Sequence, residues 1–335
     1  MTVQAIPDAA ERLRAVASGD VDIAAVAATA QLASLAGDAH DAAVALGTGF
    51  DHVDLQTAGG GVFDPATYGG DEQRAHAVRA AFLATIPRAD LLVQLVTPFV
   101  PDAATRRSAV RAPAPVGDPH PLPTPSTPTP STPEPTTAKT GAPDIAHAKE
   151  LLAEAKVPDP TVRLLFPAGD ERRAAAFTRI AASAAEAGIT VVDASRADWA
   201  TVLADAPNEY DAALFSWDAD PSAPVALAAG FATAGATNVD GWSDDTVDGL
   251  AAQAGAETDA DARDRLLDAL DEAIVERAWT LPLFPVPILT VWSEAVTGVP
   301  PSGTADGVLA GFPEWTPTEA AETGSDSPRD SVPPR

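Results

Sequence analysis

Cysteine is absent from this chain of 335 residues, which excludes disulfides, thiol nucleophiles and cysteine-ligated metal sites. Aromatic residues make up only 5% of the sequence, and alanine supplies much of its 46% hydrophobic content. We therefore expect alanine-rich helices that pack closely. No apolar run approaches the roughly 18 residues needed to cross a bilayer. The N-terminal sequence also lacks the basic and apolar regions of a signal peptide.

Positive charge is scarce as well. The chain has 21 Lys and Arg residues against 48 Asp and Glu residues, which gives a formal net charge of -27. Such a chain repels nucleic acid and anionic lipid surfaces, so we expect no nucleic-acid partner. The charge mainly favours solubility, and attraction of cationic solutes is a weaker effect that salt screens.

The motifs of common catalytic sites are missing too. No glycine-rich turn is followed by Lys-Ser or Lys-Thr, no His-Glu-x-x-His pair occurs, and there is no Gly-x-Ser-x-Gly. Carboxylates are so plentiful that no pair of them identifies an acid–base site. We therefore expect a protein that is not an enzyme and that uses no metal or cofactor.

Composition divides the chain into zones. Residues 1–111 alternate short apolar runs with amphipathic segments, and residues 144–316 show clearer periodicity. Between them, residues 112–143 include the run PTPSTPTPSTPEPTT, which favours polyproline II and cannot bury a core. We expect a disordered loop there, with a partner motif or glycosylated stalk as the alternative. Residues 318–335 are predicted to be a disordered tail.

Apolar spacing and capping residues predict the helices and strands. Expected helices cover Asp8–Val16, Asp71–Leu83, Pro87–Leu95, Asp144–Ala155, Glu171–Ala187, Asp198–Leu203, Ser243–Ala254 and Thr258–Ala278, with Ser243 and Thr258 as N-caps; expected strands cover His52–Gln56, Thr161–Phe166, Ile189–Asp193, Tyr210–Ser216, Leu281–Phe284 and Ile288–Trp292. The alternation of strands and helices with short connections predicts an α/β fold with a parallel sheet. Prolines at 282, 285 and 287 indicate edge positions or crossings between two lobes.

The best candidate for a binding site is the end of the Tyr210–Ser216 strand, where Trp217, Asp218 and Asp220 follow. In open α/β sheets, ligands bind beyond the carboxyl ends of strands. Trp217 would offer a flat apolar wall, and an aspartate would hydrogen-bond a cation such as an amine. The same residues also fit an Asp-Pro turn with Trp217 packed in the core.

Six segments in order resemble the peptide/nickel-type (family 5) extracytoplasmic solute-binding proteins of ABC importers. They are AVASGDVDIA (15–24), RAHAVRAAFLATIPRADLL (74–92), DIAHAKELLAEA (144–155), YDAALFSWDAD (210–220), NVDGWSDDTVDGLAAQA (238–254) and the run 263–284 ending in TLPLF. The chain resembles the C-terminal part of these proteins. It is most similar in character to actinobacterial members, some of which are cell-wall lipoproteins.

The resemblance implies a periplasmic-binding-protein-like, type II clamshell of two lobes. Residues 1–47 would be a remnant of the first lobe, residues 48–294 the second lobe interrupted by the loop 112–143, and residues 295–317 a return to the first lobe. By this resemblance the chain is truncated and has one nearly complete wall of the cleft. We therefore expect it to bind ligand weakly, or not at all, by itself.

In oligopeptide-binding members, an Asp three residues after a strand-ending Trp holds the α-amino group of the ligand. Asp220 stands at that position relative to Trp217, and Asp218 is the alternative for the role. No Arg lies between Tyr210 and Asp220, so the sequence shows no nearby partner for a ligand carboxylate.

The resemblance thus implies a monomeric, extracytoplasmic binding component that takes a peptide or similar amine-bearing solute and delivers it to ABC permease subunits. The other hypothesis is an envelope lipoprotein-like module of the same fold, with a regulatory or scaffolding role in cell-wall glycolipid assembly. Permease and ATPase genes nearby would favour the first hypothesis, and glycosyltransferase genes the second.

Overall fold

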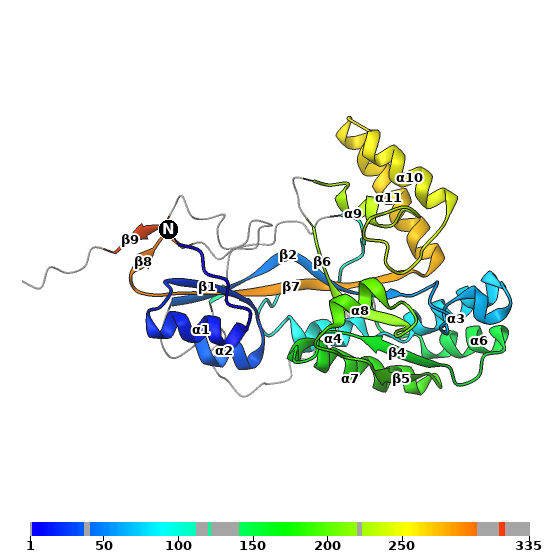
Figure 1. Cartoon of the computed structure of the whole chain (residues 1–335), viewed down its shortest axis with the longest axis horizontal. Helices are drawn as coiled ribbons and strands as arrows, with labels where there is room; N and C mark the ends of the chain where they lie inside the picture. The colour runs from blue at the N-terminus through cyan, green and yellow to red at the C-terminus, as the bar shows by residue number, and fades with distance from the viewer. Residues whose placement is uncertain are drawn as a thin grey trace, which may run out of the picture.

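The computed structural model describes residues 2–36, 41–111, 120–121, 141–219, 223–299 and 315–318, and it has the α/β composition that the sequence predicts. Two long antiparallel strands, β2 (Asp41–Leu55) and β7 (Thr280–Trp292), form its axis. Figure 1 shows them running from a smaller part, which carries α1 and α2, into a larger part, which carries the helices from α3 to α11. The two strands therefore connect both parts.

The main sheet has the strand order β1-β7-β2-β6-β4-β5. The other strands are β1 (Ile23–Ala27), β3 (His120–Pro121, paired with β2), β4 (Thr161–Leu165), β5 (Thr190–Asp193) and β6 (Ala212–Asp218), while β8 (Val296–Thr297) pairs separately with β9 (Thr316–Pro317). Strands β4, β5 and β6 are parallel to one another, whereas β2 is antiparallel to both β6 and β7. Strand β2 runs from the smaller part into the larger part. Because β6 is antiparallel to β2, β6 runs in the opposite direction, and its carboxyl end points toward the smaller part.

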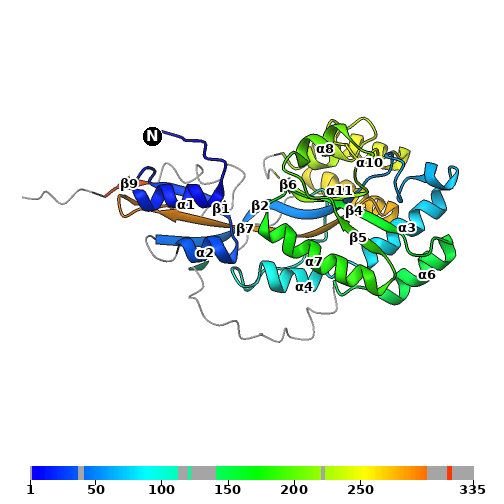
Figure 2. The same cartoon turned by 60° about the horizontal axis from the view of Figure 1, so that its bottom comes forward.

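Helices cover both faces of the sheet. They are α1 (Ala9–Ser18), α2 (Ala30–Ala36), α3 (Glu72–Ala84), α4 (Arg88–Leu95), α6 (Ile145–Ala155), α7 (Glu171–Glu186), α8 (Trp199–Asp205), α9 (Ala226–Gly230), α10 (Asp245–Ala256) and α11 (Ala260–Arg277), with a 3-10 helix at Pro65–Tyr68. In Figure 2, α8, α10 and α11 lie on one side of the sheet and α4, α6 and α7 on the other. None of the described helices is long and apolar enough to cross a membrane.

The hydrophobic core follows this layering. Leu164 of β4 belongs to the large cluster on the α7 side, whereas its neighbour Leu165 belongs to a smaller cluster with Tyr210 and Phe215. The end of β4 is therefore buried on both faces, and Leu164 and Leu165 with the following Phe166 form a short apolar run, as is typical of a strand covered on both sides. A further cluster around Trp242 packs α9, α10 and α11 together. The indole N–H of Trp242 donates to the carbonyl of Leu55 at the end of β2 over 2.9 Å, which ties this cluster to the sheet.

Aspartates at the helix starts explain why several helices lie where the sequence predicts them. The side chains of Asp8, Asp71, Asp144 and Asp170 accept the backbone N–H groups three residues further on, which caps α1, α3, α6 and α7. Such a cap stabilises a helix by about 1 kcal/mol. Gly19 ends α1 in the left-handed conformation with φ 78°, as its position predicts.

Two predicted N-caps are wrong by one residue. Asp244 caps α10 in place of Ser243, and Asp259 caps α11 in place of Thr258. In both sequences an aspartate directly follows the hydroxyl residue, and its carboxylate is the stronger acceptor for the free N–H groups at the helix start.

The parallel arrangement predicted from the alternating strands and helices is confirmed for β4, β5 and β6. It does not extend to the whole sheet, because β2 and β7 run antiparallel to their neighbours. The expected strands Leu281–Phe284 and Ile288–Trp292 are one strand, β7, and the expected strand at 52–56 is the end of the much longer β2. β1 pairs only with residues 288–292 of β7, so the three prolines fall in an edge stretch of the described sheet. A missing N–H is tolerated there, as the proline positions predict.

Candidate functional site

The predicted binding residues lie at the end of β6, which extends to Asp218 and does not end at Ser216 as the sequence suggests. Trp217 is half-buried and pairs in register with Phe50 of β2, while Asp218 is exposed and pairs with Gly49. A Cβ atom at position 49 would lie 2.7 Å from Oδ1 of Asp218, so glycine leaves room for that carboxylate. Asp220 lies outside the described residues.

Trp217 is held in place by a buried carboxyl group. Its indole Nε1–H donates to Oδ2 of Asp54 over 3.2 Å. The other oxygen of Asp54 lies 2.8 Å from Nδ1 of His52, and both of these side chains are fully buried. The indole also stacks on the His52 ring, with ring centroids 5.4 Å apart and an interplanar angle of 20°. Alternation along β2 places His52 and Asp54 on the face that Trp217 shares.

His52 is a neutral part of this packing. Burial lowers the pKa of its imidazole below the ordinary value of 6.5, and the neighbouring Asp54 only partly offsets that effect. Since a carboxylate accepts hydrogen bonds, Nδ1 of His52 carries the proton that faces Asp54. The His52 ring also meets the Phe215 ring edge to face, with ring centroids 4.3 Å apart. The wall behind Trp217 is therefore aromatic and rigid.

The opposite face of β2 carries a buried ionic cluster. Asp51 forms ion pairs with Arg172 and with Arg173, the latter at 3.2 Å. The hydroxyl of Ser216 donates to Asp51 over 2.7 Å and accepts from Arg173 over 2.7 Å. Burial lowers the pKa of Arg172 to about 9, so it is still a cation at neutral pH. Arg173 also pairs with Asp170, the cap of α7, which ties this helix start to the sheet.

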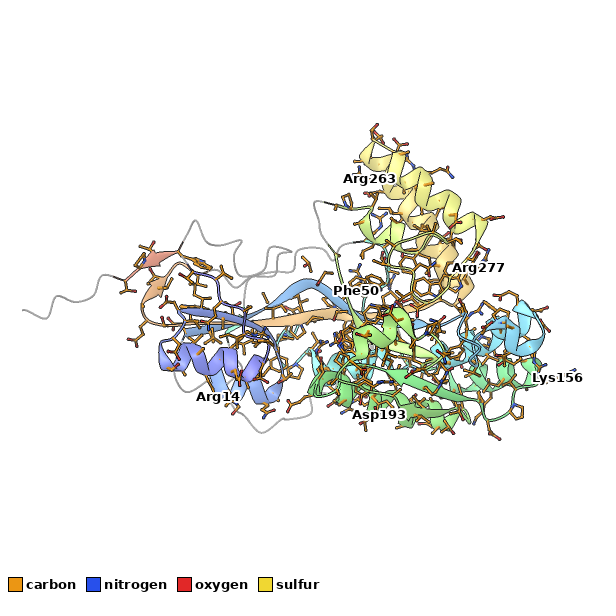
Figure 3. All side chains as sticks on the ribbon, in the orientation of Figure 1. Arg14, Phe50, Lys156, Asp193, Arg263 and Arg277 are labelled. Carbon is orange, nitrogen blue, oxygen red and sulfur yellow. The ribbon has the colours of Figure 1, made fainter. Side chains whose placement is uncertain are left out.

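A third cation, Arg106, lies beside the same strand. The carbon of its guanidinium group is 3.7 Å from the centre of the Phe50 ring. Figure 3 labels Phe50 where β2 enters the larger part, next to the end of β6. Arg106 therefore joins Phe50, His52 and Trp217 on one face of the sheet, although it is distant from all three in the sequence.

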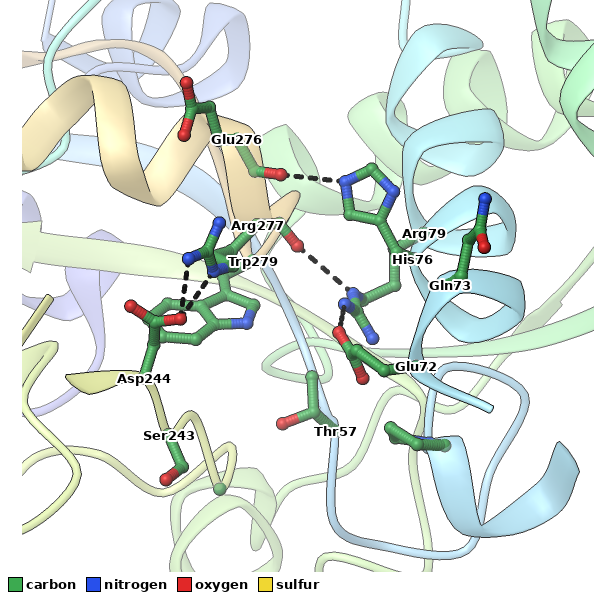
Figure 4. Close-up of a pocket in the computed structure, with 12 residues that line it drawn as sticks. Thr57, Glu72, Gln73, His76, Arg79, Ser243, Asp244, Glu276, Arg277 and Trp279 are labelled. Carbon is green, nitrogen blue, oxygen red and sulfur yellow. Dashed lines mark hydrogen bonds and ion pairs between the residues drawn. The ribbon is translucent and has the colours of Figure 1, made fainter. Parts of the chain in front are cut away.

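A separate cavity of about 680 Å³ lies at the far end of β2, between α3 and the helix pair α10 and α11 (Figure 4). Its charged residues bind one another: Arg79 pairs with Glu72, and Arg277 pairs with Asp244 over 2.7 Å. His76 is bonded through Nε2 to the carbonyl of Glu276 over 2.8 Å. Because these groups satisfy one another, the cavity offers less to a ligand than the end of β6 does.

The sequence made Trp217 and Asp218 candidates but gave no indication of most of the residues around them. His52 and Asp54 had a signal, since Phe50, His52 and Asp54 alternate along one strand face. The glycines at 47 and 49 obscured that strand. Arg106 had no local signal, because only the chain path brings it to Phe50.

A family model matches most of the chain. The model for bacterial extracellular solute-binding proteins, family 5 (middle), matches residues 1–238, and the chain belongs to this family. The resemblance found in the six sequence segments is thereby confirmed. No curated protein matches the chain in sequence.

Solved structures share the fold at low identity. The periplasmic EDTA-binding protein EppA is 20% identical with a TM-score of 0.75, and the match covers 94% of this chain and 58% of that one. NikA from Staphylococcus aureus in complex with Ni(L-His)2 is 15% identical (TM-score 0.63; 90% and 58% covered). DppA from Helicobacter pylori in complex with the peptide STSA is 19% identical (TM-score 0.63; 93% and 56% covered). The periplasmic-binding-protein-like α/β fold is confirmed, and the chain spans less than two thirds of these structures.

Proposed function

We propose that this chain supplies a wall of the binding cleft in an ABC-importer solute-binding protein, which takes a peptide or similar amine-bearing solute without altering it chemically. The observation that carries the proposal is Trp217, a half-buried indole at the end of β6 whose N–H group is held by buried Asp54. A fixed indole at this edge gives a ligand a flat apolar surface where open α/β sheets bind their ligands. The peptide held by DppA supports this class of ligand.

Asp218 and Asp220 are the proposed partners of the ligand amine. Asp218 is exposed next to Trp217, and Asp220 follows two residues later. The variants Asp218→Asn and Asp220→Asn show which aspartate binds the amine. The assay compares tri-alanine with N-acetyl-tri-alanine, which lacks the charged amine, and only the aspartate that binds the amine is needed to prefer the first peptide. We expect Asp220→Asn to abolish that discrimination, while an effect confined to Asp218→Asn would move the role to Asp218.

The lobe arrangement belongs to the same proposal. The smaller part would belong to the first lobe and the larger part to the second, with the first crossing between them near residues 47 and 48. Because residues 288–292 of β7 pair with β1, that end of β7 would lie in the first lobe as well, so the return begins before the expected residue 295. The pairing of β2 with β7 is irregular between Leu46 and Phe50, close to the proposed boundary. Bending there would close the cleft over a solute. The protein would act outside the cytoplasm, as a monomer, and deliver its solute to permease subunits.

The test is equilibrium binding of tri-alanine, used up to millimolar concentrations because a single wall binds weakly. Trp217→Ala should weaken binding about tenfold, since burying an aromatic side chain contributes about 1.5–3 kcal/mol. Trp217→Phe keeps a ring and should retain much of the affinity. If neither variant differs from the wild type, Trp217 is not part of the cleft. If no peptide binds, the scaffolding module of the envelope becomes the better hypothesis.

A further inference from the structure

Trp279 presents an indole N–H group to the cavity between α3 and the helix pair α10 and α11. The residue lines this cavity and is only 3% exposed, and its Nε1 atom has no hydrogen-bond partner among the described residues. Figure 4 shows the nitrogen on the side of the ring that faces Glu72 and Arg79. Because an indole N–H can only donate, a ligand group that accepts a hydrogen bond would satisfy it.

Stacking holds this indole in place. The ring of Trp279 lies on that of Trp242 with centroids 5.7 Å apart and an interplanar angle of 6°, and Trp242 stacks in turn on Phe231 at 4.9 Å. The backbone carbonyl of Trp279 also accepts the N–H of Leu55 over 2.9 Å. The donor is therefore fixed before a ligand arrives, and little ordering entropy is lost when it is used.

The charged side chains that face the cavity neutralise one another, which makes it a poor site for an ion. Arg79 pairs with Glu72. Arg277 pairs with Asp244 over 2.7 Å, and the carboxylate of Glu276 points away from both pairs (Figure 4). An anion in the cavity would lie beside two carboxylates, and a cation would lie beside two guanidinium groups. An uncharged ligand avoids both kinds of repulsion.

The remaining polar groups of the lining include both donors and acceptors. Only Oε1 of Glu72 is used in its ion pair, so Oε2 can accept. The hydroxyl of Thr57 donates to the carbonyl of Asp240 over 2.9 Å and keeps lone pairs that can accept as well. The exposed amide of Gln73 can donate and accept. With the indole N–H of Trp279, this mixture matches hydroxyl groups, because each hydroxyl both donates and accepts.

We propose that this cavity binds an uncharged solute rich in hydroxyl groups, a sugar or polyol, with Trp279 donating to one of its oxygens. The cavity volume of about 680 Å³ lies within the roughly 300–1,000 Å³ of small-molecule sites. Leu55 beside the cavity lies five residues along β2 from Phe50, which pairs with Trp217. That interval is roughly 17 Å along the strand, so the site is separate from the proposed cleft and does not depend on a peptide ligand.

The first test follows the indole N–H signals of the six tryptophans in the full chain by NMR. The signals of Trp279 and Trp217 are assigned by their loss in Trp279→Phe and Trp217→Phe. Glucose, trehalose and myo-inositol are the probes, each titrated to high millimolar concentration. We expect at least one of them to shift the Trp279 signal saturably while the Trp217 signal stays in place. No saturable shift of Trp279 with any probe, or a shift confined to Trp217, overturns the inference.

The second test measures affinity for the probe that shifts Trp279, by calorimetry. Trp279→Phe removes the N–H group and keeps a ring, so the affinity should fall roughly two- to tenfold, as expected for one hydrogen bond. Trp199→Phe makes the same change outside the cavity lining and should leave the affinity unchanged. Thermal midpoints confirm that both variants are folded. Equal affinity in Trp279→Phe and the wild type overturns the role of the indole.

Two further comparisons separate this site from the cleft and test its neutrality. Glucuronate and glucosamine carry a charge on a similar ring and should shift Trp279 a few-fold more weakly than glucose does. A charged sugar that binds more tightly than glucose contradicts the neutral site. Trp279→Phe should leave the binding of tri-alanine unchanged. Loss of tri-alanine binding in this variant would place both ligands in one site and overturn the inference, without contradicting peptide binding itself.

Discussion

The carboxylate of Asp51 shows how one residue joins a strand to a helix. It forms ion pairs with Arg172 and Arg173 and accepts a hydrogen bond from Ser216, and its side chain is only 2% exposed. Ser216 is the residue before Trp217, so the cluster fixes the end of β6 from the face opposite the candidate site. The sequence could not predict this cluster, because Asp51 lies on β2 while its partners come from α7 and β6, and the three elements are far apart in the sequence.

Asp51→Ala should therefore destabilise the protein strongly. Removing the carboxylate leaves two guanidinium groups buried with less negative charge, and breaking a buried pair costs about 3–5 kcal/mol. The matched control is Asp90→Ala, which breaks the exposed ion pair with Arg179 (2.9 Å) and should cost less than about 1 kcal/mol. Urea unfolding measures both variants. Similar losses in the two would show that the Asp51 cluster is no stronger than a surface pair.

Asp240 gives a prediction about pH. Its carboxyl is 1% exposed and accepts a hydrogen bond from the hydroxyl of Tyr210 over 3.1 Å. Burial, together with the nearby Asp54, raises its pKa well above 3.8. The folded state therefore keeps a proton that the unfolded state releases, and the stability from this group is lost as the pH rises above about 4.

Asp240→Asn removes this dependence while keeping an acceptor for Tyr210. The thermal midpoint of the variant minus that of the wild type should increase from pH 4.5 to pH 8. Thermal unfolding in matched buffers measures the difference. A constant difference across that range would mean that Asp240 titrates normally in the folded protein.

Most helices of this chain could be predicted from local signals, because capping aspartates and apolar spacing act within one element. Helix ends follow the same rules, but α6 ends unusually. Its C-cap is Lys156, which adopts the left-handed conformation with φ 54°. Glycine is favoured there, because a side chain raises the energy of that conformation by roughly 1 kcal/mol.

Lys156→Gly should therefore stabilise the protein by about 1 kcal/mol. The change keeps the carbonyl that accepts a hydrogen bond from Arg74 over 3.1 Å. Lys149 lies exposed within α6 and provides the opposite control, since Lys149→Gly should cost about 1 kcal/mol. Chemical denaturation measures both changes. Loss of stability in Lys156→Gly would show that the lysine side chain makes a stabilising contact that exceeds the strain.

At the scale of the whole molecule, the sequence predicted the α/β class and the place of Trp217 but not the long antiparallel axis. In β2, Gly47 and Gly49 break the alternation of side chains, and in β7 the prolines divide one strand into two apparent ones. Both features depend on pairing between segments more than 200 residues apart. Pairing at such a distance leaves no local periodicity, so only the folded chain reveals it.

The net charge of -27 is also a property of the whole molecule. Repulsion among excess carboxylates opposes the compact state, and salt screens it over roughly 10 Å at 0.1 M. The thermal midpoint should therefore rise between 20 mM and 500 mM sodium chloride, even though exposed ion pairs such as Arg196 with Asp198 weaken. Potassium chloride should act equally, and each kcal/mol gained corresponds to about 2–4 °C for a domain of 150–250 residues. A midpoint that falls with salt would show that ion pairs outweigh the repulsion.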